Sequence, residues 1–405
     1  MAATRRKFLS TAAGTGAVIS IGSQIPPFWL EAVANENARR ETVLVVVQMS
    51  GGNDGLNTIV PFRDEAYRKA RPQIGIPTTG VLRIDDEFGF HPSARGFADL
   101  LESHRLAIVQ GVGYPHPNRS HFESMDIWHT CQHKGGSRAS GWLGRFSEAD
   151  PSNSTDISGV YLGDGKLPLA LVGRKTQSLS ISSPESFRLT EQDNLQLGQV
   201  LKELSAPLPE SPDELLGFLQ SSTASALAAS EKITASMKEY QSGVSYPDSG
   251  LARKLRIVAQ LIAADIPTRV YYVELDGFDT HSQQPDAHAA LLSELSLASK
   301  AFLDDMADHG QGNRVLLFCF SEFGRRVAEN ASEGTDHGAA APVFLAGKPI
   351  QSGLIGKHPS LADLDDGDLK HHTDFRQVYA ALLQNWLGWD SVAILGRRFD
   401  PVQVF

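Results

Sequence analysis

Short apolar runs without polar alternation mark the expected strands of a central sheet. The clearest is residues 315–320, Val-Leu-Leu-Phe-Cys-Phe, which has no polar position. Such a run is typical of a strand buried on both faces, as in a parallel sheet. We therefore expect a mostly parallel sheet. Its strands are expected at residues 42–49, 106–110, 269–275, 315–320 and 342–345, with weaker candidates at 160–162 and 169–172.

Apolar residues spaced three and four apart predict helices between these strands. They are expected at residues 97–103, from Ser120 onward, at 192–204, 212–240, 251–264 and 285–309, and from Thr373 or Asp374 to Trp386. The middle of the chain, about residues 190–265, has no group of catalytic residue types, and we interpret it as a helical insertion over the sheet edge. The rest of residues 35–405 is expected to form one α/β domain with helices on both faces of the sheet.

The N-terminus has the pattern of an export signal. Arg5 and Arg6 precede a weakly apolar run that continues to Ile25, and Ala32-Val33-Ala34 offers a small-x-small cleavage site. The run is too short and too weakly apolar for a membrane span. Paired arginines are typical of twin-arginine signals, so we expect residues 1–34 to be removed after the Tat translocase exports the folded chain. The mature protein is then periplasmic or secreted, and no later segment is apolar enough to span a membrane.

Composition narrows the class of partner. Of the 405 residues, 41% are hydrophobic and 21% are charged, which is typical of a globular protein. The formal net charge of −10 argues against a nucleic-acid partner, because binding to phosphate backbones needs a basic face. Two cysteines, Cys131 and Cys319, are too few for a disulfide scaffold, and whether they pair is left open.

Acidic and histidine residues follow three of the predicted strands. Ligands of open α/β sheets bind beyond the carboxyl ends of the strands, so these side chains are expected to converge at one edge. Carboxylates and imidazoles together suit a divalent metal such as Zn, Mn or Ca. The alternative is a set of capped turns with surface charges, and Asp54 in particular suits a helix cap. The predicted ligands are Asp54, Asp279, His281, Glu322, Asp336 and His337.

A rigid Gly/Pro-containing turn leads to Ser120 at an expected helix start. Ser120 is a candidate N-cap with Glu123 completing a capping box, and equally a candidate nucleophile, because a helix N-terminus favours an alkoxide and an anionic substrate. His121 is a candidate proton donor. Arg119 and Arg325 are candidate ligands for anionic substrate oxygens.

The motifs resemble an exported bacterial family catalogued as domain of unknown function 1501. The resemblance covers nearly the whole chain, and several motifs match in order. They are residues 45–61, 113–128, 277–281, 321–330 and 334–338. This family resemblance implies no particular activity.

A weaker resemblance is to the alkaline phosphatase superfamily, which includes nucleotide pyrophosphatases and sulfatases. Those enzymes have Asp-Gly after the first strand, as at Asp54, and a Ser or Thr nucleophile where Ser120 stands. An Asp and a His follow a later strand, as Asp279 and His281 do here. The segment 334–338 is similar to the final-His segment of nucleotide pyrophosphatases. The resemblance implies an alkaline phosphatase-like fold and a metal-dependent ester hydrolase.

Several features depart from that superfamily. Ser321-Glu322-Phe323-Gly324 stands where Ser-Asp-His-Gly is expected, so Phe323 replaces an imidazole and weakens a second metal site. The spacing from Asp279 to His281 is shorter than in the superfamily. In a competing assignment, Asp336 and His337 are the Asp-His pair, and His371 or His372 is the last ligand.

These patterns predict an exported metal-dependent hydrolase of phosphate or sulfate esters, whose substrate is a small or polymer-linked anionic ester. The alternative is a non-catalytic exported binding or scaffold protein on a degenerate phosphatase-like fold. A third interpretation is a serine esterase in which Asn53 serves an oxyanion hole and Asp368 pairs with His371.

Overall fold

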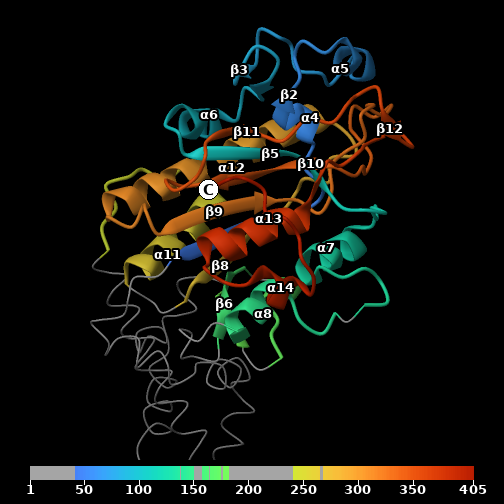
Figure 1. Cartoon of the computed structure of the whole chain (residues 1–405). Coiled ribbons are helices and arrows are strands. Elements are labelled where there is room, and N and C mark those ends of the chain that lie inside the picture. The colour runs from blue at the N-terminus through green and yellow to red at the C-terminus, as the bar shows by residue number, and fades with distance from the viewer. Residues whose placement is uncertain are drawn as a thin grey trace, which may run out of the picture.

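A mostly parallel sheet forms the centre of the computed structural model (Figure 1). The structure describes residues 42–136, 138–149, 157–163, 165–174, 177–181, 240–264 and 268–405. In these residues the sheet has the strand order β11-β5-β10-β9-β1-β8-β6-β7, with β14 paired to β5. The strands are β1 (Val43–Met49), β5 (Leu106–Gly113), β6 (Ile157–Leu162), β7 (Gln177–Ile181), β8 (Val270–Leu275), β9 (Val315–Phe320), β10 (Ala341–Ala346), β11 (Gly353–Ile355) and β14 (Thr373–Asp374).

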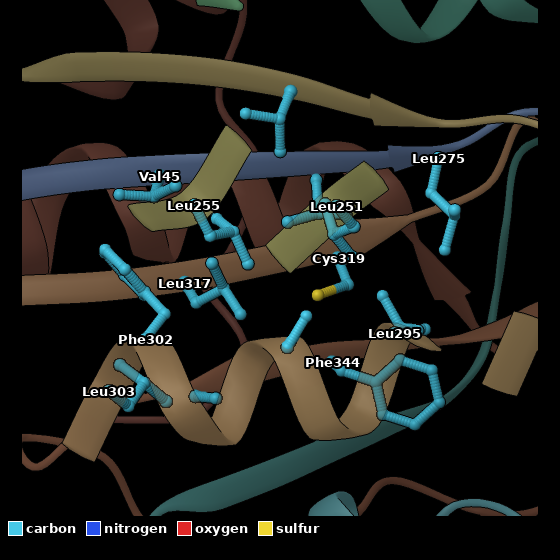
Figure 2. Packing of buried hydrophobic residues seen from close by; sticks show 14 of the residues in the cluster. Val45, Leu251, Leu255, Leu275, Leu295, Phe302, Leu303, Leu317, Cys319 and Phe344 are labelled. Carbon is cyan, nitrogen blue, oxygen red and sulfur yellow. The ribbon is translucent and has the colours of Figure 1, made fainter. Parts of the chain in front are cut away.

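Alternation along β1 divides the core into two apolar layers. Val43, Val45 and Val47 face one layer, and Leu44 and Val46 face the other. The first layer packs under α6 (Arg95–Glu102), α11 (Gly250–Ala263) and α12 (Gln284–Asp308). Figure 2 shows part of it, where side chains of the sheet meet those of α11 and α12. All seven β1 residues are buried, which explains the absence of polar alternation in that run.

The second layer packs under helices from both halves of the chain. These are α7 (His121–Thr130), α8 (Trp142–Ala149), α13 (Phe375–Ala381), the π-helical turn η3 (Leu382–Trp386) and α14 (Ser391–Leu395). Trp128 stacks between Phe320 and Phe375, at centroid distances of 5.0 and 4.5 Å. This packing fixes α7 against the carboxyl end of β9, where the first turn of α7 reaches the site described below.

The smaller elements occur between β1 and β14 in chain order. They are α4 (Gly55–Thr58), β2 (Ile59–Val60), α5 (Glu65–Ala70), β3 (Leu82–Arg83), β4 (Gly89–Phe90), the 3-10 turn η1 (Leu169–Leu171), β12 (Leu364–Asp365) and β13 (Asp368–Leu369). Among the described helices, none has both the length and the hydropathy needed to cross a bilayer.

The expected fold class is confirmed: the central sheet is mostly parallel, with helices on both faces. One strand prediction is wrong, because residues 169–171 form the 3-10 turn η1. The pattern did not predict one strand direction: β10 runs antiparallel to both β5 and β9. The signal at 1–34, the helix expected at 192–204 and all but the last residue of the helix expected at 212–240 lie outside the described residues and stay predictions.

Cys131 and Cys319 do not pair. Both are free and buried, and they belong to different core layers: Cys131 is the C-cap residue of α7, and Cys319 lies on the α12 side of the sheet.

Candidate metal centre

Three loops at the carboxyl ends of neighbouring strands form the candidate site. We call them the β1 loop (residues 50–54), the β8 loop (276–283) and the β9 loop (321–340). The β1 and β8 loops touch at Gly51, where φ is +117° and an added Cβ would lie 2.3 Å from Asp279 N. The β8 and β9 loops touch at Gly334, where a Cβ would lie 2.3 Å from the His281 carbonyl carbon. Only glycine permits these approaches, so the glycines bring the three loops together.

Asp279 is the centre of the site. Its Oδ1 lies 3.0 Å from His281 Nε2 and 3.1 Å from His337 Nε2, and its Oδ2 lies 3.4 Å from His121 Nε2. Burial opposes the charge of this carboxylate, but the hydrogen bonds from Arg325 and His337, together with the charge of Arg325, outweigh it, and the pKa of Asp279 is lowered to about 2. The group therefore remains an anion at neutral pH, with three imidazole nitrogens around it.

Each of these histidines is held by its other ring nitrogen. The Nδ1 atom of His121 lies 2.8 Å from Glu322 Oε1, that of His281 lies 3.1 Å from Asp336 Oδ1, and that of His337 lies 2.7 Å from the Arg119 carbonyl oxygen. Ionised carboxylates and carbonyls only accept hydrogen bonds, so the proton of each neutral ring is assigned to Nδ1. The lone pairs on Nε2 then point toward Asp279.

Two observations show that this arrangement fits a cation. The Nε2 atoms of His281 and His337 are 2.9 Å apart, where two lone pairs repel unless a proton or metal ion lies between them. The Nε2 atom of His121 is buried and has no hydrogen-bond partner in the described residues. Ligand atoms at about 2.0–2.2 Å from one ion lie about 3.0–3.5 Å apart, which agrees with the separations around Asp279.

In the part of the chain that the structure describes, the ligand atoms of His121, Asp279 and His337 all lie within 4.8 Å of one another. His281 joins them through its contacts with Asp279 and His337. The predicted residue Asp336 lies behind His281, whose hydrogen bond to Asp336 lowers the pKa of that carboxyl. The competing assignment is disfavoured, because His371 and His372 are outside this group.

Glu322, predicted as a ligand, is buried in a backbone nest instead. Its Oε1 accepts from Gly51 N at 2.9 Å and its Oε2 accepts from Gly52 N at 3.2 Å. The positive φ angles of the two glycines turn successive N–H groups toward one acceptor, which is an anion-binding geometry. The carboxylate that fills it also holds His121, and this hydrogen bond raises the pKa of His121. Glu322 therefore orients a histidine and does not face the cluster.

Arg325 also has an internal role. Its guanidinium is fully buried and donates to the carbonyl oxygens of Gly52 at 2.8 Å, Thr335 at 2.8 Å and Phe278 at 2.9 Å, and to that of Gly51. It also donates to Asp279 Oδ1 at 2.7 Å. Because these donors are bonded to the three loops, Arg325 holds the loops together and is not placed as a ligand for substrate.

Asp54 lies apart from the cluster. Its carboxylate is 1% exposed, caps α4 through Asn57 N at 3.3 Å, and forms a buried ion pair with Arg71 at 2.6 Å. Burial raises the pKa of Asp54, but the charge of Arg71 and the hydrogen bonds from Arg71 and Gln284 together outweigh that effect, and the pKa lies below its ordinary value. Asp54 is thus a helix cap, as the alternative interpretation proposed. Its charged partner is the Arg71 guanidinium, where the sequence suggested a metal ion.

The remaining predicted residues surround the site. Ser120 is the N-cap residue of α7 and is exposed, but its side chain makes no capping hydrogen bond, and Glu123 pairs with Arg138, so the capping-box prediction is wrong. Arg119 forms an ion pair with Asp368 of β13 at 2.6 Å. Asp368 thus has an arginine as its partner, whereas the esterase interpretation paired it with His371.

Asn53 belongs to the β1 loop, and its side chain is fully buried beneath that loop. Its Oδ1 accepts from Thr58 and from His288, both at 3.0 Å. This position gives its amide no access to a substrate, contrary to the sequence expectation. Phe323 is 2% exposed and packs its ring against His121 and His337, at 5.0 and 4.7 Å, as an apolar floor.

Sequence reasoning missed Arg71 and Gln284, which both bind Asp54. Arg71 stood in a segment without periodicity, so no pattern marked it. Gln284 is the first residue of α12, next to Pro285, and a polar residue at a helix start gives no signal that it is buried.

Comparison with known proteins identifies a family and finds weakly similar solved structures. The family described as Protein of unknown function (DUF1501) matches residues 41–387. No curated protein sequence matches the chain. The lipoteichoic acid synthase LtaP from Listeria monocytogenes is 8% identical, with a TM-score of 0.39 over 91% of this chain and 76% of that one.

Two further solved structures have comparably low scores. The PsFucS1 sulfatase from Pseudoalteromonas sp. is 10% identical, with a TM-score of 0.37 over 92% of this chain and 72% of the sulfatase. A protein in the alkaline phosphatase superfamily from Vibrio parahaemolyticus is 9% identical, with a TM-score of 0.33 over 88% of this chain and 69% of that one. At these scores the likeness carries no argument about fold, activity or substrate.

Proposed function

The chain belongs to the DUF1501 family of proteins of unknown function, and from its site we propose that it is an exported, metal-dependent hydrolase of phosphate or sulfate esters. The observation that carries the proposal is the convergence of three imidazole Nε2 atoms on the Asp279 carboxylate, each ring being fixed by a hydrogen bond at Nδ1. Such a bond on the remote nitrogen is typical of metal-binding histidines.

Asp279, His281 and His337 would hold the ion, with His121 as a further ligand. This nitrogen-rich set favours zinc, because imidazole suits zinc and calcium prefers six or more oxygen ligands. Manganese is intermediate, since it accepts both oxygen and nitrogen donors. A bound divalent ion would act as a Lewis acid and lower the pKa of a hydroxyl or water beside it.

Ser120 is the proposed nucleophile. Its hydroxyl is exposed and not used for capping, and it precedes His121 directly. The N-terminus of α7 presents backbone N–H groups without helical partners, which favour an anionic group such as a phosphoryl or sulfuryl oxygen. Attack by Ser120 Oγ on phosphorus or sulfur would form a serine ester and release the alcohol. His121 could instead exchange protons with the nucleophile, since Glu322 orients its ring.

Export through the Tat pathway is part of the proposal. Paired arginines, a weakly apolar run and a small-residue cleavage site support it. A substrate outside the cytoplasm, small or polymer-linked, would then be within reach of the enzyme.

The test measures metal content first and turnover second. Protein purified in folded form is analysed by elemental mass spectrometry, and then screened with aryl phosphate monoesters, diesters and sulfate esters in the presence of Zn, Mn or Ca. We expect about one ion per chain, and His337→Gln to lose it. His104→Asn is the matched control, because His104 is exposed and has the positive φ of 57° that asparagine tolerates.

Turnover then assigns the serine. Ser120→Ala is expected to keep the ion and to lose activity by several orders of magnitude. A native chain that binds no ion under any of these conditions would refute the proposal, and full activity in Ser120→Ala would refute the role of the serine.

A non-catalytic binding protein on a degenerate fold is the second candidate. The ion pair of Asp54 with Arg71 and the ring of Phe323 favour it, because both remove metal ligands expected in the superfamily. A bound ion without turnover on any ester would support this alternative.

A further inference from the structure

A single buried amide connects all three loops of the candidate site. Gln284 is 0% exposed and is the first residue of α12. Its Nε2 donates to Asp54 Oδ2 in the β1 loop. Its Oε1 accepts from Thr280 Oγ1 in the β8 loop at 3.1 Å and from Thr335 Oγ1 in the β9 loop at 2.6 Å.

The two threonines are neighbours of the proposed ligands. Thr280 lies between Asp279 and His281 in the chain, and Thr335 lies two residues before His337. The threonine backbones also meet, because Thr335 N donates to Thr280 O at 3.2 Å. A movement of either hydroxyl away from Gln284 would therefore displace a ligand-bearing segment.

The direction of each hydrogen bond fixes the orientation of the amide. Asp54 is ionised and only accepts, so the NH2 group of Gln284 must face it, and the carbonyl must face the threonines. The reverse orientation would satisfy none of the three partners, because it would turn the amide oxygen toward the Asp54 carboxylate and remove the acceptor of both threonine hydroxyls. Both threonines are also buried, Thr280 being 6% and Thr335 0% exposed, so water does not replace a lost partner without cost.

We propose that Gln284 is a positioning residue of the ion site, whose side-chain amide fixes the distance between the β8 loop and the β9 loop. This inference rests on the proposed function for its effect on the ion, while its effect on the loops stands separately. Gln284 touches neither ion nor substrate. It holds His281 and His337 at the short separation that the ion requires, through Thr280 and Thr335.

Gln284→Met tests the inference, because methionine keeps the length of the side chain and removes both hydrogen-bonding groups. We expect zinc affinity, measured by competition with a chromophoric chelator, to fall about 10- to 100-fold, as for other residues that orient ligands. In metal-free protein, hydrogen exchange is expected to increase in the peptides covering residues 277–283 and 333–338.

Gln311→Met is the matched control. Gln311 is also buried, at 4%, and lies just beyond the other end of the same helix, about 37 Å away along α12. It accepts from Arg314 at 3.3 Å. A variant that only loses stability would resemble this control, with zinc affinity and loop exchange unchanged.

Thr280→Val and Thr335→Val complete the test. Each is expected to weaken zinc binding in the native background and to have little further effect in Gln284→Met, because the shared partner is already absent. Unchanged zinc affinity and unchanged exchange in Gln284→Met would overturn the inference. A native chain that binds no zinc would instead overturn the proposed function, and the exchange measurement would still decide whether Gln284 positions the loops.

Discussion

Replacing Glu322 by Gln probes the nest that orients His121. The carboxylate is 2% exposed, and each oxygen has two donors: Oε1 faces Gly51 N and His121 Nδ1, and Oε2 faces Gly52 N and Ser321 Oγ. In either orientation, a glutamine NH2 group would face a backbone N–H that then has no acceptor. A buried donor left unpaired costs about 1–3 kcal/mol, and the lost charge weakens the remaining bonds. We expect the free energy of unfolding to fall by about 2–4 kcal/mol.

The assay is guanidinium denaturation followed by tryptophan fluorescence, since Trp128 and Trp142 are buried in aromatic stacks. Glu329→Gln is the matched control. Glu329 also accepts from two successive backbone N–H groups, those of Gln73 and Ile74, but it is only half-buried, so water can replace the lost acceptor. We expect the control to cost under about 1 kcal/mol.

Equal losses in Glu322→Gln and Glu329→Gln would refute this reasoning. They would mean that the carboxylate in the nest has no stabilising role beyond that of a surface cap.

Three other predictions concern the same loops. In metal-free protein His121 has a raised pKa, so its stabilising contribution is complete below about pH 6.5 and is lost as pH rises through the folded-state pKa. The native chain exceeds Glu322→Gln in free energy of unfolding, and this difference should shrink as pH rises through the folded-state pKa of His121. Denaturation curves at several pH values measure it. Arg71→Met leaves Asp54 buried without its cation and should cost about 3–5 kcal/mol in the same assay. Gly51→Ala should cost more than the about 1–2 kcal/mol of a left-handed backbone alone, because its Cβ meets Asp279 N.

Two variants serve as controls for these changes. Arg95→Met breaks an exposed pair with Asp99 and should cost at most about 1 kcal/mol. Gly396→Ala has a φ of +80° but open space around the added Cβ, so it measures the backbone cost without a clash. If Arg71→Met is as mild as Arg95→Met, or Gly51→Ala as mild as Gly396→Ala, the corresponding argument is wrong.

The strands were predictable because a strand that is buried on both faces is apolar at nearly every position. Residues 315–320 are entirely apolar and form β9, and the run at 42–49 forms β1. The apolar pattern of residues 342–345 predicts a strand but says nothing about its direction. Parallel neighbours need a long crossover, usually a helix, whereas residues 321–340 contain no helical periodicity, and this signal indicates the antiparallel pairing of β10 with β9.

The site was predictable in its location and less so in the role of each residue. Asp279, His281 and His337 follow strands whose carboxyl ends meet, so their proximity follows from the topology. The positions of Glu322 and Asp54 depend on partners distant in sequence, a glycine nest and Arg71, which no local pattern reveals. A carboxylate at a strand end has the same sequence pattern whether it faces a cation or caps backbone N–H groups.

The placement of the two cysteines supplies the protein with built-in chemical reporters. Burial raises the pKa of the Cys131 thiol to about 12 and that of the Cys319 thiol further, so neither reacts readily with alkylating reagents in the native chain. One thiol belongs to the C-cap residue of α7, in the core layer on that side of the sheet, and the other lies on the α12 side. The rate at which each becomes alkylated therefore reports separately how often each helical layer lifts from the sheet, without the introduction of a label.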